Sequence, residues 1–172
     1  MRALGAVILG LVVGCTPALN WREWRAPANT LVALWPCKPQ QAERSVALAG
    51  RTVRLTLAQC DADGATWALT RADVGDPAQV GPALAALREA ALGNIGADRP
   101  ADVAGLQVPG ATPYREAAAF NAAGRRPGGA AVQLRVALFA HGTTVWQATV
   151  LAPRLDAEAA ALFFGALRFL PA

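Results

Sequence analysis

Residues 132–151 read VQLRVALFAHGTTVWQATVL and decide the fold. The apolar residues of the first half recur at every second position, which is the period of a β-strand: Val132, Leu134, Val136 and Leu138. A turn at His141-Gly142 and a return strand over 145–151 predict a hairpin whose paired residue numbers sum to 283. In that register Leu138 faces Val145 and Ala137 faces Trp146. Apolar residues occur on both faces, which predicts two central strands that are covered on each side.

The flanking sequence adds further strands and two helices. Asp76-Pro77 is typical of a helix start, although Gly81-Pro82 predicts either a kink or a later start at Pro82. Asp156 is the predicted cap of a second, short helix. Strands are expected over 20–25, 30–35, 66–71 and 166–170, and a short strand over 106–108. The segment over 116–121 is expected to be a strand or a helix, and a loop is expected over 124–129. The expected fold class is therefore α+β, a twisted and mostly antiparallel sheet with two helices packed on it.

The N-terminus predicts export. Arg2 precedes an uncharged apolar stretch over 3–13, which has the length of a signal-peptide core and is too short to span a bilayer. The stretch ends in Val12-Val13-Gly14-Cys15, which resembles the lipobox of bacterial lipoprotein signals. The resemblance implies a cleaved signal peptide (1–14), an acylated Cys15, a tether (15–19) and one α+β domain (20–172). Thr16 stands where that family commonly places an Asp for inner-membrane retention, so the resemblance implies a periplasm-facing outer-membrane location. An ordinary secretory signal and an uncleaved anchor are the alternatives.

Export bears on Cys37 and Cys60, because an oxidising compartment favours a disulfide. Alternating residues over 46–58 and a turn at Ala49-Gly50 predict a hairpin whose paired numbers sum to 99. Pro39 then faces Cys60, and Cys37 lies two residues away, within reach of a disulfide if the strand bulges or twists. The bond would close a loop of 24 residues. A redox-active thiol pair is the alternative, although the close C-x-x-C spacing is missing.

A wider resemblance rests on three segments, LWPCKP (34–39), VWQATV (145–150) and FFGALRF (163–169). Together they resemble small proteobacterial lipoproteins of unknown function and, more remotely, are similar to the PsbP-like α/β fold. That fold implies binding, assembly or stabilisation of other proteins, with catalysis unusual. Its frequent Pro-Gly-Lys-Pro segment is Pro-Cys-Lys-Pro here, and no family site is carried over to a numbered residue.

Composition argues against several functional classes. The net charge of +4 comes from scattered arginines, which form no basic stripe that favours nucleic acid. The chain has one histidine, His141, and one serine, Ser45, which lacks a G-x-S-x-G context. Asp61-Ala62-Asp63-Gly64 departs from a calcium loop in the place of its glycine, so a turn is expected there. We therefore expect no metal, no cofactor and no catalytic residues.

Three features are candidates for a binding surface. Trp21 and Trp24 stand close to the anchor, where they either rest among lipid headgroups or pack on their own strand. Arg125-Arg126 would meet an acidic partner or lie in a solvated loop, and Tyr114 is expected to cover the core. The expected function is a lipid-anchored, non-catalytic binding or scaffolding domain of the cell envelope, held to the membrane by acyl chains and meeting an envelope protein. The alternatives are a periplasm-facing hydrolase-like enzyme that uses scattered carboxylates and His141, and a carrier of small apolar ligands in a large apolar cavity.

Overall fold

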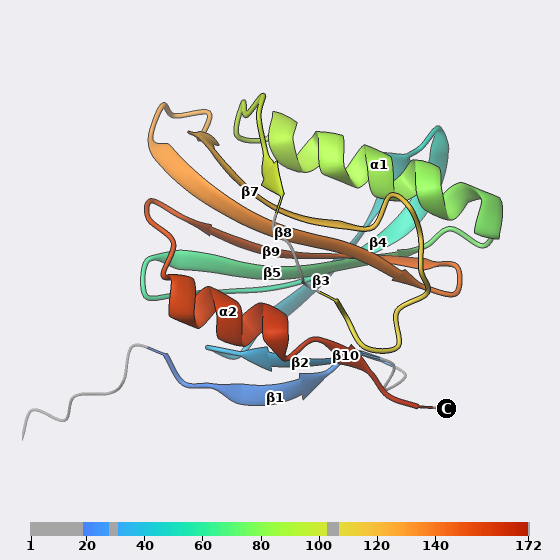
Figure 1. The fold of residues 1–172 in the computed structure, drawn as a ribbon, viewed down its shortest axis with the longest axis horizontal. Helices are drawn as coiled ribbons and strands as arrows, with labels where there is room; N and C mark the ends of the chain where they lie inside the picture. The colour runs from blue at the N-terminus through green and yellow to red at the C-terminus, as the bar shows by residue number, and fades with distance from the viewer. Residues whose placement is uncertain (1–18, 28–30, 103–106, 172) are drawn as a thin grey trace, which may run out of the picture.

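A computed structural model describes residues 19–27, 31–102 and 107–171. Cys15 and the signal segment lie outside the described residues. The chain forms a seven-stranded antiparallel sheet in the order β3-β4-β5-β9-β8-β7-β6 (Figure 1). Its strands are β3 (Gln40–Leu48), β4 (Arg51–Ala62), β5 (Ala65–Asp73), β6 (Ala101–Asp102), β7 (Ala118–Arg125), β8 (Ala131–His141) and β9 (Thr144–Ala152). The α+β class and the mostly antiparallel pairing are confirmed.

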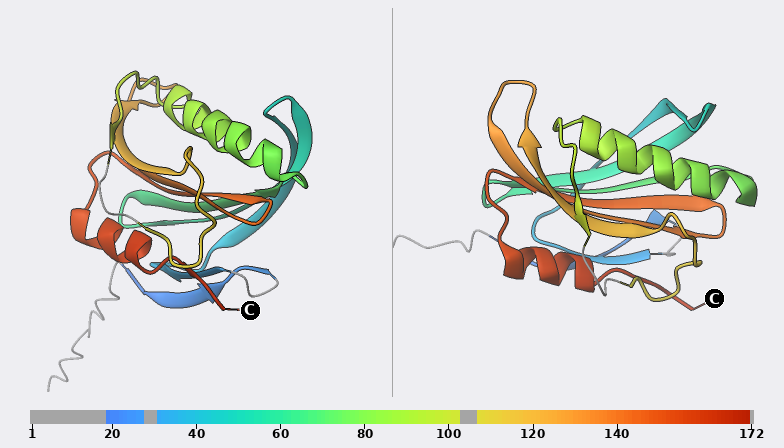
Figure 2. Two further views of the ribbon diagram at one scale, coloured as in Figure 1. Left: turned by 45° about the vertical axis from the view of Figure 1, so that its right-hand side comes forward. Right: turned by 45° about the horizontal axis from the view of Figure 1, so that its top comes forward.

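The ends of the chain build a second sheet. β1 (Arg22–Arg25), β2 (Leu31–Trp35) and β10 (Arg168–Phe169) pair in the order β1-β2-β10. This small sheet and α2 (Ala157–Gly165) cover one face of the large sheet, while α1 (Pro77–Gly93) crosses the other face (Figure 1). The rotated views in Figure 2 show the same layers and the strong twist of the large sheet. The sequence predicted these strands, but it did not predict that they would form two separate sheets.

Each helix begins where an aspartate caps it. The Asp76 side chain accepts the amide of Ala78, and the Asp156 side chain accepts the amides of Glu158 and Ala159. α1 begins at Pro77, so the alternative start at Pro82 is wrong. Pro82 is tolerated inside the first turns because it removes one backbone hydrogen bond while the cap and the buried apolar face hold the rest of the helix.

The first long hairpin has the predicted register, since Val46 pairs with Val53 and the paired numbers sum to 99. The second hairpin does not: Leu138 pairs with Gln147 and Ala137 with Ala148, which gives a sum of 285 rather than 283. The reason is the turn, which is Gly142-Thr143 and not His141-Gly142. Gly142 takes a φ of 58° at the first turn position, a conformation that glycine adopts without strain.

Two further predictions are wrong. Val108 lies outside any strand, and Leu106 lies outside the described residues; the short strand before β7 is β6 instead. The segment over 116–121 resolves to a strand, but β7 continues through Arg125, so the loop is shorter than 124–129. β7 extends this far because Arg125 pairs with Ala131 and donates its amide to Ile95.

Two apolar clusters fill the space on either side of the large sheet. The α1 side holds Val80, Leu84 and Phe120, together with the even-numbered apolar residues of β8. The α2 side holds Trp35, Trp67 and Phe163, whose rings meet edge to face at centroid distances of 5.3–5.6 Å. This arrangement explains the apolar residues on both faces of β8 and β9. Among the described residues, no helix has the length and apolar character needed to cross a membrane.

Candidate functional site

The predicted disulfide is present between Cys37 and Cys60, whose Cα atoms lie 6.1 Å apart. Cys37 follows β2 of the small sheet, and Cys60 lies in β4 of the large one. The bond therefore ties the two sheets together near the start of β3. Because both thiols are consumed, the bond accounts for two of the three cysteines in the chain.

Trp21 and Trp24 are half-buried and pack on the domain itself. The Trp21 ring meets Trp67 edge to face at 5.7 Å, and the Trp24 ring meets Trp35 at 5.8 Å. Between them, Glu23 accepts hydrogen bonds from Arg25 and from Arg168 of β10. The Arg25 guanidinium, helped by Arg168, holds the pKa of the Glu23 carboxyl below its usual range. The first strand is thus fixed to the domain by both aromatic and ionic contacts.

Arg125 and Arg126 are both exposed at the turn between β7 and β8. The Arg125 guanidinium donates to the carbonyl of Gly129 at 2.8 Å and so braces its own hairpin turn. Arg126 is exposed in that turn, and its backbone pairs with Ala130.

His141 ends β8 beside the C-terminal strand. Its Nδ1 lies 2.9 Å from the carbonyl oxygen of Gly110, and its ring stacks on Phe169 at 4.4 Å. No described carboxylate is hydrogen-bonded to it. Ser45 lies on the edge strand β3, four strand positions away from β8, which corresponds to roughly 19 Å at the usual spacing between strands. The two side chains therefore do not meet.

The turn predicted over Asp61–Gly64 is present between β4 and β5, but it is formed by Asp63-Gly64 because Asp61 and Ala62 belong to β4. Asp61 accepts a hydrogen bond from Thr66 across that turn at 2.6 Å. Within the described ranges, no group of three or more His, Cys, Asp or Glu side chains is placed to hold a metal ion.

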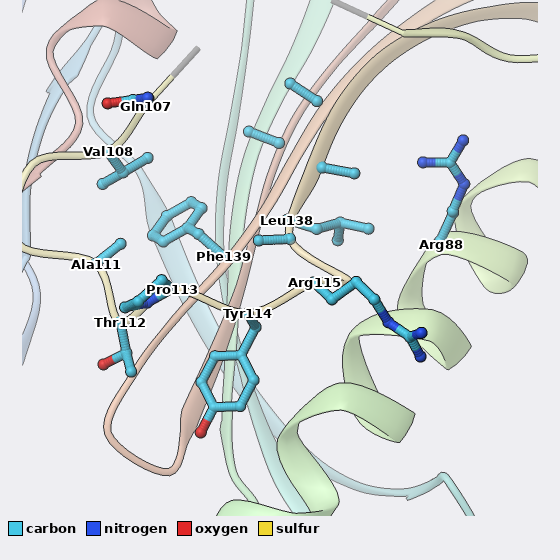
Figure 3. Close-up of a pocket in the computed structure, with 14 residues that line it drawn as sticks. Arg88, Gln107, Val108, Ala111, Thr112, Pro113, Tyr114, Arg115, Leu138 and Phe139 are labelled. Atoms are coloured by element: carbon cyan, nitrogen blue, oxygen red, sulfur yellow. The ribbon is translucent and has the colours of Figure 1, made fainter. Parts of the chain in front are cut away.

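An open cleft of about 750 Å³ lies on the described surface. It lies between α1, the start of β7, the end of β8 and the segment over 107–115 (Figure 3). We call it the β7 cleft. Its floor is made of small and aromatic residues around the start of β7, with Ala118 on the α1 face of the sheet and Ala119, Ala137 and Phe139 on the α2 face. Its rim carries Thr112, Tyr114 and Arg115. The volume is in the range of small-molecule sites.

Charge enters the β7 cleft from two elements. Arg88 comes from α1, and its guanidinium carbon lies 4.6 Å from the centre of the Phe120 ring. Arg115 comes from the opposite rim and contacts Glu116 at 3.3 Å, while nine-tenths of its side chain is exposed. Figure 3 shows both guanidinium groups at the α1 side of the cleft, with Phe139 and Val108 at the other side. The cleft thus has guanidinium groups at one end and apolar surface at the other.

No family model, no curated protein and no solved structure significantly matches this chain. The site is therefore described from its own geometry.

The sequence did not predict the β7 cleft. Tyr114 was expected to cover the core; it is half-buried against the α1-side cluster and also lines the cleft. The one available signal was the alanine run over 117–119, because small side chains on a strand beside a glycine- and proline-rich connector leave space above the sheet. Arg88 of α1 and Phe139 of β8 are far apart in the sequence, and only the tertiary fold brings both to this cleft.

Proposed function

We propose that this chain is a lipid-anchored, non-catalytic binding protein of the bacterial cell envelope. In this proposal the peptide over 1–14 is removed, Cys15 carries the acyl chains, and the domain projects from the outer membrane into the periplasm. Several acyl chains make a stable anchor, since each buried CH₂ contributes about 0.8 kcal/mol.

The Cys37–Cys60 bond is the observation that carries the proposal. Disulfides persist in oxidising compartments such as the periplasm and are rare in the cytosol. The bond also leaves Cys15 as the remaining cysteine of the chain, at the position that the lipobox resemblance implies. The pairing of Cys37 with Cys60 thus supports both export and the lipidation of Cys15.

The β7 cleft supports the binding role. It is open, has the volume of a ligand site and combines a small-residue floor with cationic and hydroxyl groups on its rim. His141 has no described carboxylate within hydrogen-bonding distance and lies far from Ser45, so the geometry favours binding over the hydrolase-like alternative. The mixed polar and apolar lining favours a polar occupant over a purely apolar cargo.

The proposal also includes the two families that the sequence resembles. We place the chain with small proteobacterial lipoproteins and, more remotely, with the PsbP-like fold. The relation rests on the sequence segments LWPCKP (34–39), VWQATV (145–150) and FFGALRF (163–169).

Fractionation of cells that express the full chain tests the anchor. The wild-type protein should sediment with the outer membrane and leave it only with detergent. Cys15→Ala should abolish lipid labelling and prevent cleavage after residue 14, because the acylated cysteine is what the lipoprotein peptidase recognises. An unlabelled wild-type chain would contradict the proposal.

Recovery of partners from native envelopes tests the binding role. Ala119→Leu fills the floor of the β7 cleft, while Ala47→Leu adds the same bulk on exposed β3 as a matched control. Envelope components that copurify with wild type and with Ala47→Leu should be lost with Ala119→Leu. If Ala119→Leu retains them all, the β7 cleft is not the binding site.

A further inference from the structure

A second cavity, of about 470 Å³, lies where the start of α2 meets β7 and β8. It is separate in its lining residues from the β7 cleft. Arg135 of β8 and Arg99, which follows α1, both line it. We call it the Arg135 pocket.

Arg135 lacks the partners that a half-buried guanidinium normally has. Its Nε is buried without a hydrogen-bond acceptor, and it makes no ion pair with any described residue. Its guanidinium carbon lies 5.0 Å from the centre of the buried Phe164 ring, which offsets part of the cost of burial. The enclosed Nε cannot be reached from the pocket, but the two terminal nitrogens of Arg135 are not among the buried unpaired atoms, so they are the donors that an acceptor in the pocket can meet.

The other described residues around the pocket also favour an anion. Arg99 adds a second positive charge, and no described Asp or Glu lines the cavity. Gln133 accepts the amide of Leu155 through Oε1 at 2.8 Å, so its Nε2 group is left as a donor. Asp156 already accepts hydrogen bonds from the first backbone amides of α2. An anion in the pocket would therefore be bound by Arg135, Arg99 and the side-chain amide of Gln133.

The remaining wall is apolar. Leu155, Ala157 and Ala160 line the side of the pocket formed by α2 and the chain before it. A free inorganic ion would leave this wall uncovered, whereas an anion attached to a short hydrocarbon would cover it.

From these contacts we propose that the Arg135 pocket binds a small amphiphilic oxyanion, a carboxylate or phosphate monoester on a short alkyl chain. The guanidinium groups of Arg135 and Arg99 hold the anionic oxygens, because arginine pairs with both groups through two parallel hydrogen bonds. The α2 side chains cover the alkyl chain. This site stands apart from the β7 cleft and does not depend on the lipid anchor.

Calorimetric titration of the purified full chain, with probe injected into the same buffer as the blank, tests the proposal. The probes are hexanoate, hexyl phosphate and the uncharged hexanol. Hexanoate or hexyl phosphate should bind with saturation, the tighter of the two identifies the preferred oxyanion, and hexanol should not saturate. Arg135→Met should weaken the tighter probe at least tenfold, and the exposed Arg99→Met should weaken it to a smaller extent.

Arg54→Met, which removes an exposed arginine of β4, is the matched control and should bind as wild type does. The Arg99→Met variant keeps the test decisive if Arg135→Met fails to fold, because Arg99 is exposed. The proposal is overturned if neither anion binds, if hexanol binds equally well, or if binding survives both pocket substitutions unchanged.

Discussion

At Gly124 the backbone of β7 approaches the backbone that follows α1. Gly124 lies in β7 beside the end of α1, and the next residue, Arg125, donates its amide to the carbonyl of Ile95 at 2.7 Å. A Cβ placed on Gly124 would collide with that same carbonyl group. The position therefore requires glycine for space.

We expect Gly124→Ala to lower the free energy of unfolding by about 2–3 kcal/mol, because a backbone carbonyl cannot move aside as a side chain can. Gly128→Ala, in the following turn, adds a Cβ with no atom within 4 Å and should change it by less than about 0.5 kcal/mol. Urea denaturation of both variants measures the difference. If Gly124→Ala and Gly128→Ala unfold with the same free energy, the close contact between β7 and the Ile95 carbonyl would be contradicted.

Asp73 links two turns and makes stability depend on pH. It accepts hydrogen bonds from the Thr143 hydroxyl at 2.7 Å and from the Gly75 amide at 2.9 Å. The Thr143 hydroxyl, followed by that amide, lowers the pKa of the Asp73 carboxyl below its ordinary 3.8. A lowered folded-state pKa means that this stabilisation is complete above the unfolded-state pKa and is lost as the pH falls through the folded-state value.

Thr143→Val should therefore raise the pKa of Asp73 toward its ordinary value and cost about 0.5–1 kcal/mol at pH 7. The difference from wild type should shrink as the pH falls through the lowered folded-state pKa of Asp73, because the carboxyl then becomes protonated in both proteins. A carboxyl-carbon NMR titration reads the pKa, and unfolding curves at pH 7 and pH 2.5 read the stability. An unchanged Asp73 pKa in the variant would refute the link.

At the scale of elements, the disulfide joins the end of β2 to β4. Its 23-residue sequence separation encloses β3 and the first hairpin turn. In the chain-entropy account, closing a loop of this size stabilises the fold by about 3 kcal/mol. We expect the double variant Cys37→Ser/Cys60→Ser to lose about that much in chemical denaturation, and reductant to lower the wild-type melting temperature without affecting the variant. A free thiol at Cys60, mapped in oxidised wild-type protein, would contradict the pairing.

The elements were predictable where one local signal dominated. Asp76 and Asp156 mark their helices, and the alternation over 52–57 fixes both the first hairpin and its register. The second hairpin was predicted as a pair of strands but in the wrong register. The predicted and observed registers differ by two residues, a shift that leaves every side chain on the same face of the sheet. Burial therefore does not discriminate between them, and the turn residues alone decide.

The sites were less predictable than the elements. The disulfide followed from cysteine spacing, whereas the β7 cleft and the Arg135 pocket depend on contacts between segments far apart in the sequence. Arg135 and Phe164, for example, meet only because α2 packs beneath β8. The division into two sheets was also out of reach, because β10 is two residues long and pairs with β2 from the opposite end of the chain.

For the molecule as a whole, the N-terminal strand belongs to the folded domain. Trp21 packs on Trp67, and Glu23 bonds to Arg168 near the C-terminus, so the described fold begins within a few residues of the tether. An acyl anchor at Cys15 would thus hold the domain close to the membrane. The α2 side of the molecule, where β1 lies, would then face the bilayer more nearly than the α1 side (Figure 1).

Export and lipidation are tested by the intact mass of the full chain, extracted from bacterial membranes with detergent. We expect a mature chain of 158 residues (172 minus 14) that begins at Cys15, carries acyl chains and retains one disulfide. The same measurement on Cys15→Ala should show no acyl mass. A wild-type mass that corresponds to all 172 residues, or to a cleaved chain without lipid, would contradict the account.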